Sequence, residues 1–200
     1  MAKLYYQGHG SFRITSEDGR VIYVDPYAGD GYGLPADIIL VTHQHGDHNQ
    51  INLCTKSKGC RVISNKEALA GGKHRSFSID GIEIEAVVAK NLMHDPKKCV
   101  GFILTVDGVK IYAAGDTSRT VQMNSFAVRK LDYALFPCDG VFNMGLKEAS
   151  VCAQIIGARH NIPIHLKLSS LFSERRAKRW KAPNRLIIKP GEEIELQNGQ

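Results

Sequence analysis

The 200-residue chain is predicted to fold as a layered α/β protein that forms a single domain. Short segments with the composition of β-strands occur in both halves of the chain, and segments with helical periodicity lie between them. Hydrophobic residues make up 43% of the chain and charged residues 23%, so there is enough apolar material for a sizeable core. Periodicity alone does not decide which layered architecture forms.

Predicted strands joined by tight turns dominate the first part of the chain. Ser11–Thr15 and Arg20–Val24 are expected to pair as a hairpin, because turn residues separate them. Asp37–Val41 is a nearly continuous apolar run, which predicts a strand buried on both faces. Asp107-Gly108 is typical of a tight hairpin turn. The other expected strands are Lys3–Gln7, Arg61–Ser64, Gly81–Ala89, Gly101–Val106, Lys110–Ala114, Arg185–Ile188 and Glu193–Leu196.

Helices are expected between the groups of strands. The clearest is Leu146–His160, in which small and apolar residues recur at helical spacing on one face. The other expected helices are Lys66–Ala70 capped by Asn65, Ser118–Lys130 and Ser173–Lys181.

Composition excludes several classes of protein. No stretch approaches the ~20 apolar residues of a membrane span, and the first residues lack the apolar region of a signal peptide. We therefore expect a cytoplasmic protein without membrane contact. The five cysteines are odd in number and form no C-x-x-C pair, which argues against a disulfide framework and against a thiolate zinc site. Buried free thiols are the expected state.

The formal net charge of +6 is concentrated near the C-terminus. Residues 166–190 hold eight lysines and arginines against a single glutamate. The run Arg175–Lys181 within this segment is typical of a solvated helix face, and a patch for anionic ligands or nucleic acid is the alternative. Trp180 is the one aromatic residue in the run, which is too few for a platform on which bases stack.

Four potential metal ligands lie within six consecutive residues, directly after the apolar run. In an extended segment, residues two apart point the same way, so His43 and His45 can bind one metal ion. Gly46 permits a sharp turn, which brings Asp47 and His48 beside the first pair, where a second ion fits. Imidazole and carboxylate ligands without thiolate suit Zn²⁺, with Mn²⁺ and Fe²⁺ as alternatives.

This motif resembles the signature of the metallo-β-lactamase superfamily. The similarity extends over about residues 4–197, because further landmarks follow at expected strand ends: Asp25-Pro26, His94, Gly115-Asp116-Thr117 and Ile162-Pro163-Ile164-His165. The stretch Asp139–Met144, before a helix that contains Glu148 and Ala149, resembles a subgroup of small bacterial metal-dependent hydrolases related to ascorbate-6-phosphate lactonase.

The resemblance implies a four-layer αββα sandwich with two metal ions. It implies one site from His43, His45 and His94, a second site from Asp47, His48 and His165, and a bridging Asp116. Asp47 and Asp116 are then the candidate catalytic carboxylates. The complete expected ligand set is His43, His45, Asp47, His48, His94, Asp116 and His165.

Such a pair of metal ions predicts hydrolysis. A carboxylate can bridge two cations ~3.5–4 Å apart, and a water shared between them becomes a hydroxide nucleophile near neutral pH. The expected substrate is a small anionic ester, either a phosphodiester or a phosphorylated lactone. This expectation rests on Lys97, Lys98 and Lys167, which follow His94 and His165 closely enough to attract phosphate.

Two further polar residues are expected to support the ligands. His9 lies between two glycines, and Asp25 lies at a strand end, where it could accept a hydrogen bond from a ligand imidazole and fix its tautomer.

Other functions remain open alternatives. A nuclease is disfavoured because the basic run is short and no RNA-clamping insertion is evident, so no nucleic-acid partner is expected. A di-iron redox protein is disfavoured because that branch usually has glutamate where this chain has His45, and no flavin-binding domain follows. A structural metal site usually has four ligands, fewer than the seven expected here. The expected partner is a small-molecule substrate, and a homo-oligomer is left open.

Overall fold

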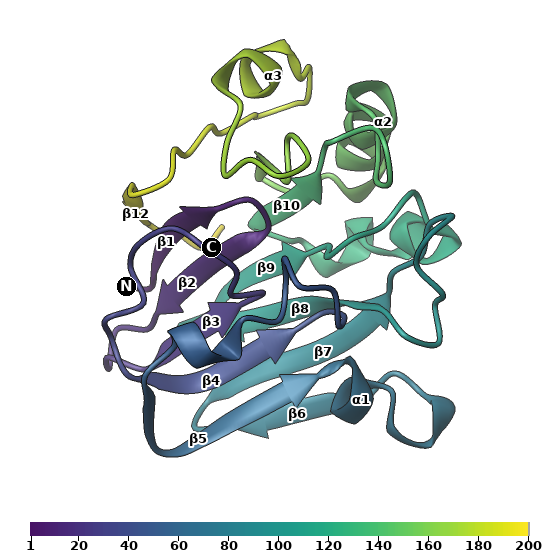
Figure 1. Cartoon of the computed structure of the whole chain (residues 1–200). Helices are drawn as coiled ribbons and strands as arrows, with labels where there is room; N and C mark the ends of the chain where they lie inside the picture. Colours follow the sequence, from purple (N-terminus) through teal and green to yellow (C-terminus); the bar gives the residue numbers. More distant parts are fainter. Residues whose placement is uncertain (200) are drawn as a thin grey trace.

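Two six-stranded β-sheets form the centre of the molecule in the computed structural model, which describes residues 1–199 (Figure 1). The first sheet has the order β12-β1-β2-β3-β4-β5, and the second has the order β11-β10-β9-β8-β7-β6. The strands are β1 (Lys3–Gly8), β2 (Ser11–Thr15), β3 (Val21–Val24), β4 (Ala36–Val41), β5 (Lys56–Ser64), β6 (Ser76–Ile79), β7 (Ile82–Val88), β8 (Val100–Val106), β9 (Val109–Ala113), β10 (Tyr133–Pro137), β11 (His160–Ile164) and β12 (Glu193–Glu195).

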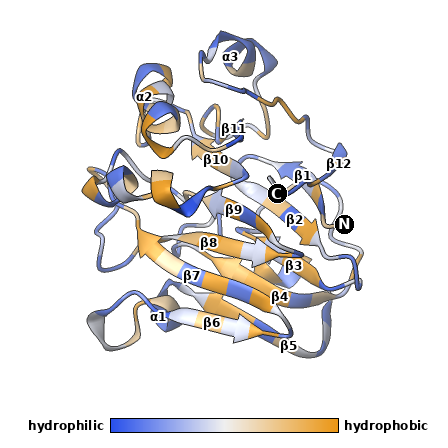
Figure 2. Cartoon of the chain, turned by 180° about the vertical axis from the view of Figure 1, so that it is seen from behind, coloured by the Kyte–Doolittle hydropathy of each residue, from blue (hydrophilic) through white to orange (hydrophobic). Residues whose placement is uncertain are grey.

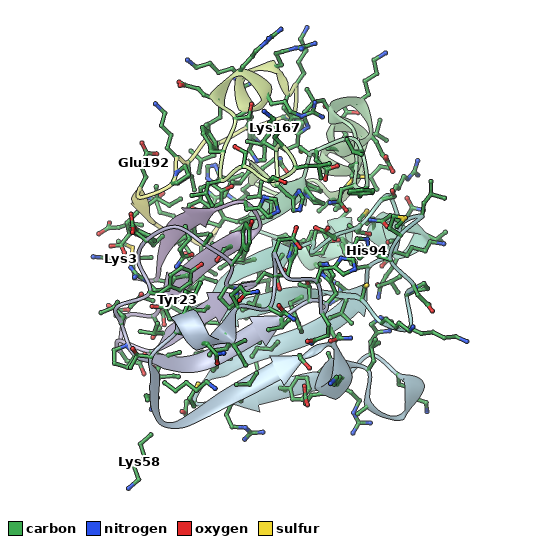
Figure 3. All side chains as sticks on the ribbon, viewed as in Figure 1. Lys3, Tyr23, Lys58, His94, Lys167 and Glu192 are labelled. Atoms are coloured by element: carbon green, nitrogen blue, oxygen red, sulfur yellow. The ribbon has the colours of Figure 1, made fainter. Side chains whose placement is uncertain are left out.

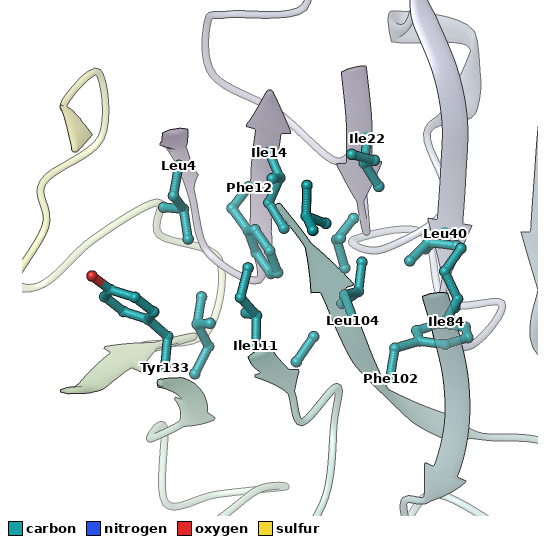
Figure 4. Packing of buried hydrophobic residues seen from close by; sticks show 14 of the residues in the cluster. Leu4, Phe12, Ile14, Ile22, Leu40, Ile84, Phe102, Leu104, Ile111 and Tyr133 are labelled. Carbon is teal, nitrogen blue, oxygen red and sulfur yellow. The ribbon is translucent and has the colours of Figure 1, made fainter. Parts of the chain in front are cut away.

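Apolar side chains on the facing surfaces hold the two sheets together. Alternate residues of a strand point to opposite faces, so Phe12 and Ile14 of β2 point to the same side. They share one buried cluster with Phe102 and Leu104 of β8, and Figure 4 shows these side chains filling the space between the sheets. Each such side chain stabilises the fold by about 1.5–3 kcal/mol when fully buried. This cluster confirms the expected sandwich of two sheets.

Helices cover the outer face of the second sheet. Helix α2 (Leu146–Ile156) places its apolar face in a buried cluster with Tyr112 of β9 and Phe136 of β10. Trp180, which directly follows helix α3 (Glu174–Arg179), belongs to the same cluster, with its ring centroid 5.8 Å from that of Phe136. Figure 2 views the molecule from this side, with α2 and α3 at one end of the sheet and the apolar colour plain on β7 and β8.

The outer face of the first sheet has a thinner cover. Tyr23 and Ile39 are buried there, and the partly buried Tyr32 and Ile51 pack against their cluster from a loop and a short 3-10 helix. Helix α1 (Asn65–Ala68) follows β5 at the end of this sheet. Throughout the described chain, each helix is too short or too polar to cross a membrane.

Two of the four expected helices differ from the structure. Ser118–Lys130 is not one α-helix; it contains two 3-10 helices, Val121–Ser125 and Ala127–Arg129, and it ends where Lys130 adopts a left-handed backbone with φ of 53°. Helix α2 ends at Ile156, before His160, because Gly157 takes the left-handed conformation that caps helix ends, with φ of 66°.

Three local expectations also need correction. Helix α1 is capped by Ser64, whose side chain accepts a hydrogen bond from the backbone of Lys66 while Glu67 bonds back to Ser64, so Asn65 is not the cap. Arg185–Ile188 is not a strand and contributes only a single bridge between Arg185 and Asn161. The short strand β6 and the strand β10 were not expected from the sequence.

Strand direction gathers the polar strand ends at one edge of the sandwich. β3 and β4 are parallel neighbours in the first sheet, and β9, β10 and β11 are parallel neighbours in the second. The carboxyl ends of parallel strands meet at the same edge, where ligands bind in α/β folds. The residues that follow these ends, together with those that follow β1 and β7, form the candidate site.

Candidate metal centre

The turn after β4 supplies four of the seven expected ligands. The backbone N–H of His48 donates to the carbonyl of His45 at 3.0 Å, which closes a tight turn around Gly46. This turn directs His43 and His48 into the protein, where both are buried, while His45 stays exposed and Asp47 is partly exposed. The local geometry that the sequence suggested is therefore present.

The other three expected ligands reach the same place from the second sheet. His94 lies in the loop between β7 and β8, Asp116 follows β9, and His165 follows β11. All three are buried. The backbone N–H of His165 donates to the carbonyl of His9 at 2.7 Å, which ties the two sheets together beside the site.

His43, His45 and His94 form a first cluster, in which ligand nitrogens lie within 4.8 Å of one another. The three imidazole rings are almost equally spaced, with centroid distances of 4.7, 4.6 and 4.7 Å. Nε2 of His94 lies 3.1 Å from Nδ1 of His45. Three nitrogens converging in this way match one face of a tetrahedral metal site, in which the fourth position is open.

Asp47, His48 and His165 form a second cluster, and His9 joins it. Oδ2 of Asp47 lies 3.7 Å from Nε2 of His165 and 4.0 Å from Nε2 of His48. Nε2 of His9 lies closer to the same oxygen, at 3.1 Å, while its Nδ1 lies 3.1 Å from the carbonyl of Ser170. With both ring nitrogens already partnered, His9 supports Asp47, in keeping with the supporting role expected for it.

Asp116 lies between the two clusters. Its Oδ1 is 3.4 Å from Nε2 of His48 and 3.7 Å from Nε2 of His165, and its Oδ2 is 3.7 Å from Nε2 of His94. One carboxylate oxygen therefore faces each cluster. This is the arrangement that a carboxylate bridging two cations requires.

Contacts on the far side of each buried imidazole fix its orientation. Nδ1 of His48 donates to Oδ2 of Asp25 at 2.9 Å, and Asp25 also accepts from the backbone and the hydroxyl of Thr42, both at 2.7 Å. Nδ1 of His43 lies 3.0 Å from the hydroxyl oxygen of Thr42. The hydrogen bond expected from Asp25 to a ligand imidazole is thus present, and it leaves Nε2 of His48 facing the site.

Several buried atoms of the site lack a hydrogen-bond partner among the described residues. Four of them face the centre: Nε2 of His43, of His48 and of His165, together with Oδ1 of Asp116. Nδ1 of His165 belongs to the same group but faces away from the centre, 3.2 Å from Oδ2 of Asp139. Buried polar atoms almost always have a partner, so a group of four that converge on one space indicates a missing ligand. Imidazole nitrogens and carboxylate oxygens are ligands for divalent cations, so these residues fit a metal centre.

The two clusters differ in how they hold protons. Burial lowers the pKa of His43 to about 2, with a further contribution from His48, and burial also lowers the pKa of His94. Burial acts against protonation in the second cluster too, but hydrogen bonds to Asp139 and Asp47 raise the pKa of His165 to about 10. Asp116 and Asp25 likewise raise the pKa of His48 against the effect of burial.

Three residues at this edge adopt a left-handed backbone although none is glycine. The φ angles are 55° for His9, 46° for Asp25 and 44° for His165. Each residue directly follows a strand, and the positive φ turns the chain sharply so that the side chain points into the site. Such conformations cost of order 1–3 kcal/mol each, and they concentrate at functional sites.

The sequence did not reveal three polar residues near the second sheet that contact the outer side of His165 and His94 or one another: Asp139, Asn143 and Asn91. Asp139 follows β10, and its Oδ2 lies 3.2 Å from Nδ1 of His165. Asn143 donates to the same oxygen at 2.7 Å, and Nδ1 of His94 lies 2.7 Å from Oδ1 of Asn91. The position of Asp139 just after a buried strand was a signal for this role, as it was for Asp25.

Two cavities open beside the centre and share His45, Met93 and His94 as lining residues. The larger has a volume of about 490 Å³ and extends toward α1, and the smaller has a volume of about 310 Å³ and extends toward Phe142 and Leu168. The larger cavity carries the charged residues Lys66, Asp95, Lys97 and Lys98 in its lining.

Comparison with known proteins agrees with this chemistry. A family model described as the Beta-lactamase superfamily domain matches residues 3–165, and the chain therefore belongs to the metallo-β-lactamase superfamily. A UPF0173 metal-dependent hydrolase from Pyrococcus furiosus is 30% identical over 227 aligned positions, which cover 98% of this chain and all of the relative. A second, from Thermococcus kodakarensis, is 31% identical over 229 positions, with 98% of this chain covered and again all of the relative. The protein is a metal-dependent hydrolase of this UPF0173 type.

Solved structures support the fold. A candidate metal-dependent hydrolase from Parabacteroides distasonis is 29% identical, with a TM-score of 0.73 over 92% of this chain and 91% of that one. A metallo hydrolase from Ignicoccus hospitalis is 20% identical, with a TM-score of 0.75 over 98% of this chain and 99% of that one. The second likeness concerns the fold alone.

Proposed function

We propose that this protein uses two divalent cations, Zn²⁺ foremost, to hydrolyse a small anionic ester in the cytoplasm. The observation that carries the proposal is the pair of clusters with Asp116 between them, in which four buried ligand atoms have no partner among the described residues. His43, His45 and His94 would hold the first cation. Asp47, His48 and His165 would hold the second, and Asp116 would serve both.

Bound cations would supply a water of lowered pKa as the nucleophile, and they would polarise the ester bond. The protein residues perform the remaining tasks. Asp116 keeps the two clusters at a fixed separation, because its two oxygens face different clusters. Asp47 is partly exposed at the mouth of the site, and His9 fixes its orientation from behind. The carboxylate of Asp47 is thus placed to hold the second cation and to orient the attacking water by accepting a hydrogen bond from it.

The two cavities suggest how the substrate lies. They meet at His45, Met93 and His94, so a bond placed at the metal centre has one cavity on each side. The larger cavity has three lysines and one aspartate in its lining, so its charge is suited to an anionic group. The smaller cavity contains Phe142 and Leu168 and is suited to a less polar group.

Lys97 and Lys98 line the larger cavity, as the anionic-substrate prediction requires, and Lys66 joins them from α1. Lys167 is exposed, and among the residues described it lines neither of the two cavities at the centre. Figure 3 shows Lys167 toward the α3 end of the molecule and His94 at the loop edge. The proposal for an anionic substrate therefore rests on Lys66, Lys97 and Lys98 and no longer on Lys167.

The basic run Arg175–Lys181 does not extend this site. In the part of the chain that the structure describes, neither cavity at the centre takes a lining residue from it. Glu174 pairs with Lys178 at 2.9 Å, and Arg176 donates to the carbonyl of Cys138 at 2.8 Å. These contacts suit a helix that stabilises the fold, and they favour a small-molecule substrate over a nucleic acid.

The proposal is tested by combining elemental analysis with a substrate panel. Protein purified without chelators is expected to hold up to two metal ions per chain and to hydrolyse phosphodiesters or phosphorylated lactones faster than neutral lactones and thioesters. The His43→Ala/His45→Ala double variant should lose the cation of the first cluster together with its activity, and it should keep at most one metal ion per chain. Two metal ions bound after this double substitution would contradict the ligand assignment, and equal rates on neutral and anionic esters would contradict the substrate class.

A further inference from the structure

A chain of side-chain contacts behind the metal centre joins a histidine of one cluster to a histidine of the other. Nδ1 of His165 lies 3.2 Å from Oδ2 of Asp139. The same oxygen accepts from Nδ2 of Asn143 at 2.7 Å, and Oδ1 of Asn143 accepts from Nδ2 of Asn91 at 2.8 Å. Oδ1 of Asn91 lies 2.7 Å from Nδ1 of His94. The chain therefore runs from one proposed ligand to another without passing through the centre.

Asp139 is the acceptor at one end of this chain, and it determines which atom donates and which accepts in the hydrogen bonds of the two asparagines. Its Oδ1 accepts hydrogen bonds from the backbone N–H groups of Val141 and Phe142, at 2.7 and 2.9 Å. Backbone N–H groups thus occupy Oδ1, and Asn143 turns its NH₂ group to Oδ2, so the amide of Asn143 has a fixed orientation.

The orientation of Asn143 in turn fixes the orientation of Asn91, because each amide donates through its NH₂ group and accepts through its oxygen. Because Asn143 turns its NH₂ group to Asp139, its carbonyl oxygen faces Asn91 and accepts from it. Asn91 then turns its own carbonyl oxygen toward His94. The backbone N–H of Met93 donates to that oxygen at 2.8 Å, and since a backbone N–H can only donate, it independently supports this orientation of Asn91.

The consequence is a defined tautomer for His94. Nδ1 of His94 faces an acceptor and must carry the proton, which leaves the lone pair on Nε2, 3.1 Å from Nδ1 of His45 and 3.7 Å from Oδ2 of Asp116. At the other end of the chain, Nδ1 of His165 faces Asp139, and its Nε2 faces Asp47 and Asp116, both at 3.7 Å. The free lone pair of His94 therefore points into the first cluster.

We propose that Asn143 and Asn91 are positioning residues that transmit the orientation set by Asp139 to His94. A single carboxylate then fixes one histidine in each cluster, and it couples the geometry of the two sites through the protein. The tautomer of His94 can be tested without any metal, whereas its consequence for metal binding rests on the metal centre proposed above. Outer contacts of this type typically change metal affinity by 10–100-fold.

The test is ¹⁵N NMR of metal-free protein with labelled histidine, in which the shifts of Nδ1 and Nε2 report the tautomer. Spectra recorded at about pH 8.5, roughly two units above the ordinary pKa of histidine, report the neutral ring. The unmodified protein should show His94 protonated on Nδ1. Asn143→Ala should increase the Nε2-protonated population about five-fold, the factor that one net hydrogen bond provides. This change is expected although Asn143 does not contact the imidazole in the chain of bonds above.

Two further variants separate this role from a general loosening of the loop. Asn65 is the matched control, because it is buried like Asn143 and holds the same loop by donating to the carbonyl of Lys98 at 2.7 Å. Asn65→Ala should leave the His94 tautomer unchanged. Asn91→Asp, placed in the Asn143→Ala background, should restore the Nδ1-protonated form, because a carboxylate accepts from His94 in either orientation.

A second readout is the affinity for Co²⁺, measured by titration against a chelator and by the visible spectrum of the bound ion. Asn143→Ala should weaken binding at the first cluster about 10-fold or more, and the Asn91→Asp background should recover most of the loss. An unchanged tautomer in Asn143→Ala would overturn the inference, as would an equal shift in Asn65→Ala. Absence of ester hydrolysis would overturn only the proposed function, because the tautomer does not depend on it.

Discussion

The two clusters of the metal centre are built in different ways. The first consists of His43, His45 and His94, and its buried histidines are kept neutral because burial lowers their pKa values. In the second, carboxylates surround His48 and His165 and raise the pKa values of both against the effect of burial. The first cluster is therefore ready to receive a cation, whereas the second holds protons that a cation must displace.

This difference follows from where the acidic residues lie. Asp25 and Asp139 follow parallel strands of different sheets, and each contacts the Nδ1 atom of a histidine in the second cluster. In the first cluster, neutral groups occupy the corresponding positions, the hydroxyl of Thr42 and the amide of Asn91. The two clusters therefore differ in the charge of the groups that contact their histidines from outside: carboxylates in the second cluster and neutral groups in the first.

The largest effect is expected from the residue that the clusters share. Asp116→Ala removes the contacts to His48 and His94 at once, so both cations should be lost or weakly held. Hydrolysis should fall by more than the roughly 100-fold upper limit that is usual for outer contacts. Metal content and kcat/KM measured on the same preparation check this. If Asp116→Ala keeps both metals and most of the activity, the two clusters are independent and Asp116 does not bridge them.

A smaller and more selective effect is expected from single ligands. His45→Ala should remove the first cation and leave the second, whereas His165→Ala should do the reverse. Each variant should bind about one metal ion per chain, and each should lose most of the activity because hydrolysis requires the pair. Elemental analysis with native mass spectrometry distinguishes the outcomes. Loss of both metals from either variant would show that the clusters bind cooperatively.

The two single variants also allow a test of pH dependence. In His45→Ala the remaining second cluster must release the proton held by His165, whose pKa is about 10, so its metal affinity should rise as the pH increases from 7 toward 10. In His165→Ala the remaining first cluster contains His43, whose pKa is about 2, so its affinity should vary much less over the same range. Calorimetry in buffers of different ionisation enthalpy counts the released protons, and equal proton release from both variants would contradict the comparison.

The sequence predicted the strands of the first sheet better than those of the second, and it predicted residues that the fold brings into two clusters. The hexapeptide after β4 encodes its own geometry, because spacing and Gly46 determine which side chains point together. Asp139 is marked only by its position after a strand that the sequence did not predict, and Asn143 carries no local signal, since the residues that they contact across the fold, His165 and Asn91, are distant in sequence. Their role emerges only when parallel strands of the second sheet bring the strand ends together.

The segment Ser118–Lys130 shows that contacts distant in sequence also decide secondary structure. Its composition permits an α-helix, but the fold divides it into two 3-10 helices that bury Met123 and Phe126 against the second sheet. Tertiary packing thus overrides a moderate local propensity. The predicted ligands come together all the same, because they lie at or near strand ends, where turn residues mark the boundaries clearly.

A moderate effect is expected at the mouth of the larger cavity. Replacing Lys66, Lys97 and Lys98 together by alanine should lower kcat/KM for an anionic ester roughly 10-fold at low salt, and by less at high salt because salt screens exposed charges. A neutral ester of the same size should be affected little. Lys167→Ala is the matched control, since this exposed lysine lies outside the lining of both cavities. Equal losses for the two esters would remove the charge argument and leave the hydrolase without a known preference.

The smallest effect is expected from the cysteines, because the two-metal site needs no thiol nucleophile. Cys99 is the informative one: it lines the larger cavity beside His94, and burial raises the pKa of its thiol to about 12. The thiol is therefore protonated and slow to react near neutral pH. Cys60 is only partly buried, so it should be alkylated first.

Alkylation by iodoacetamide, followed by mass spectrometry of each cysteine peptide, should leave hydrolysis unchanged while Cys60 is modified. Cys60→Ser is the control, because in that variant the early adduct should disappear without a change in rate. If activity falls in step with modification of Cys99 while both metals remain bound, the larger cavity holds the substrate even though the thiol is not the nucleophile. If activity falls in step with Cys60, a thiol remote from both clusters contributes to the reaction, and the centre described above is incomplete.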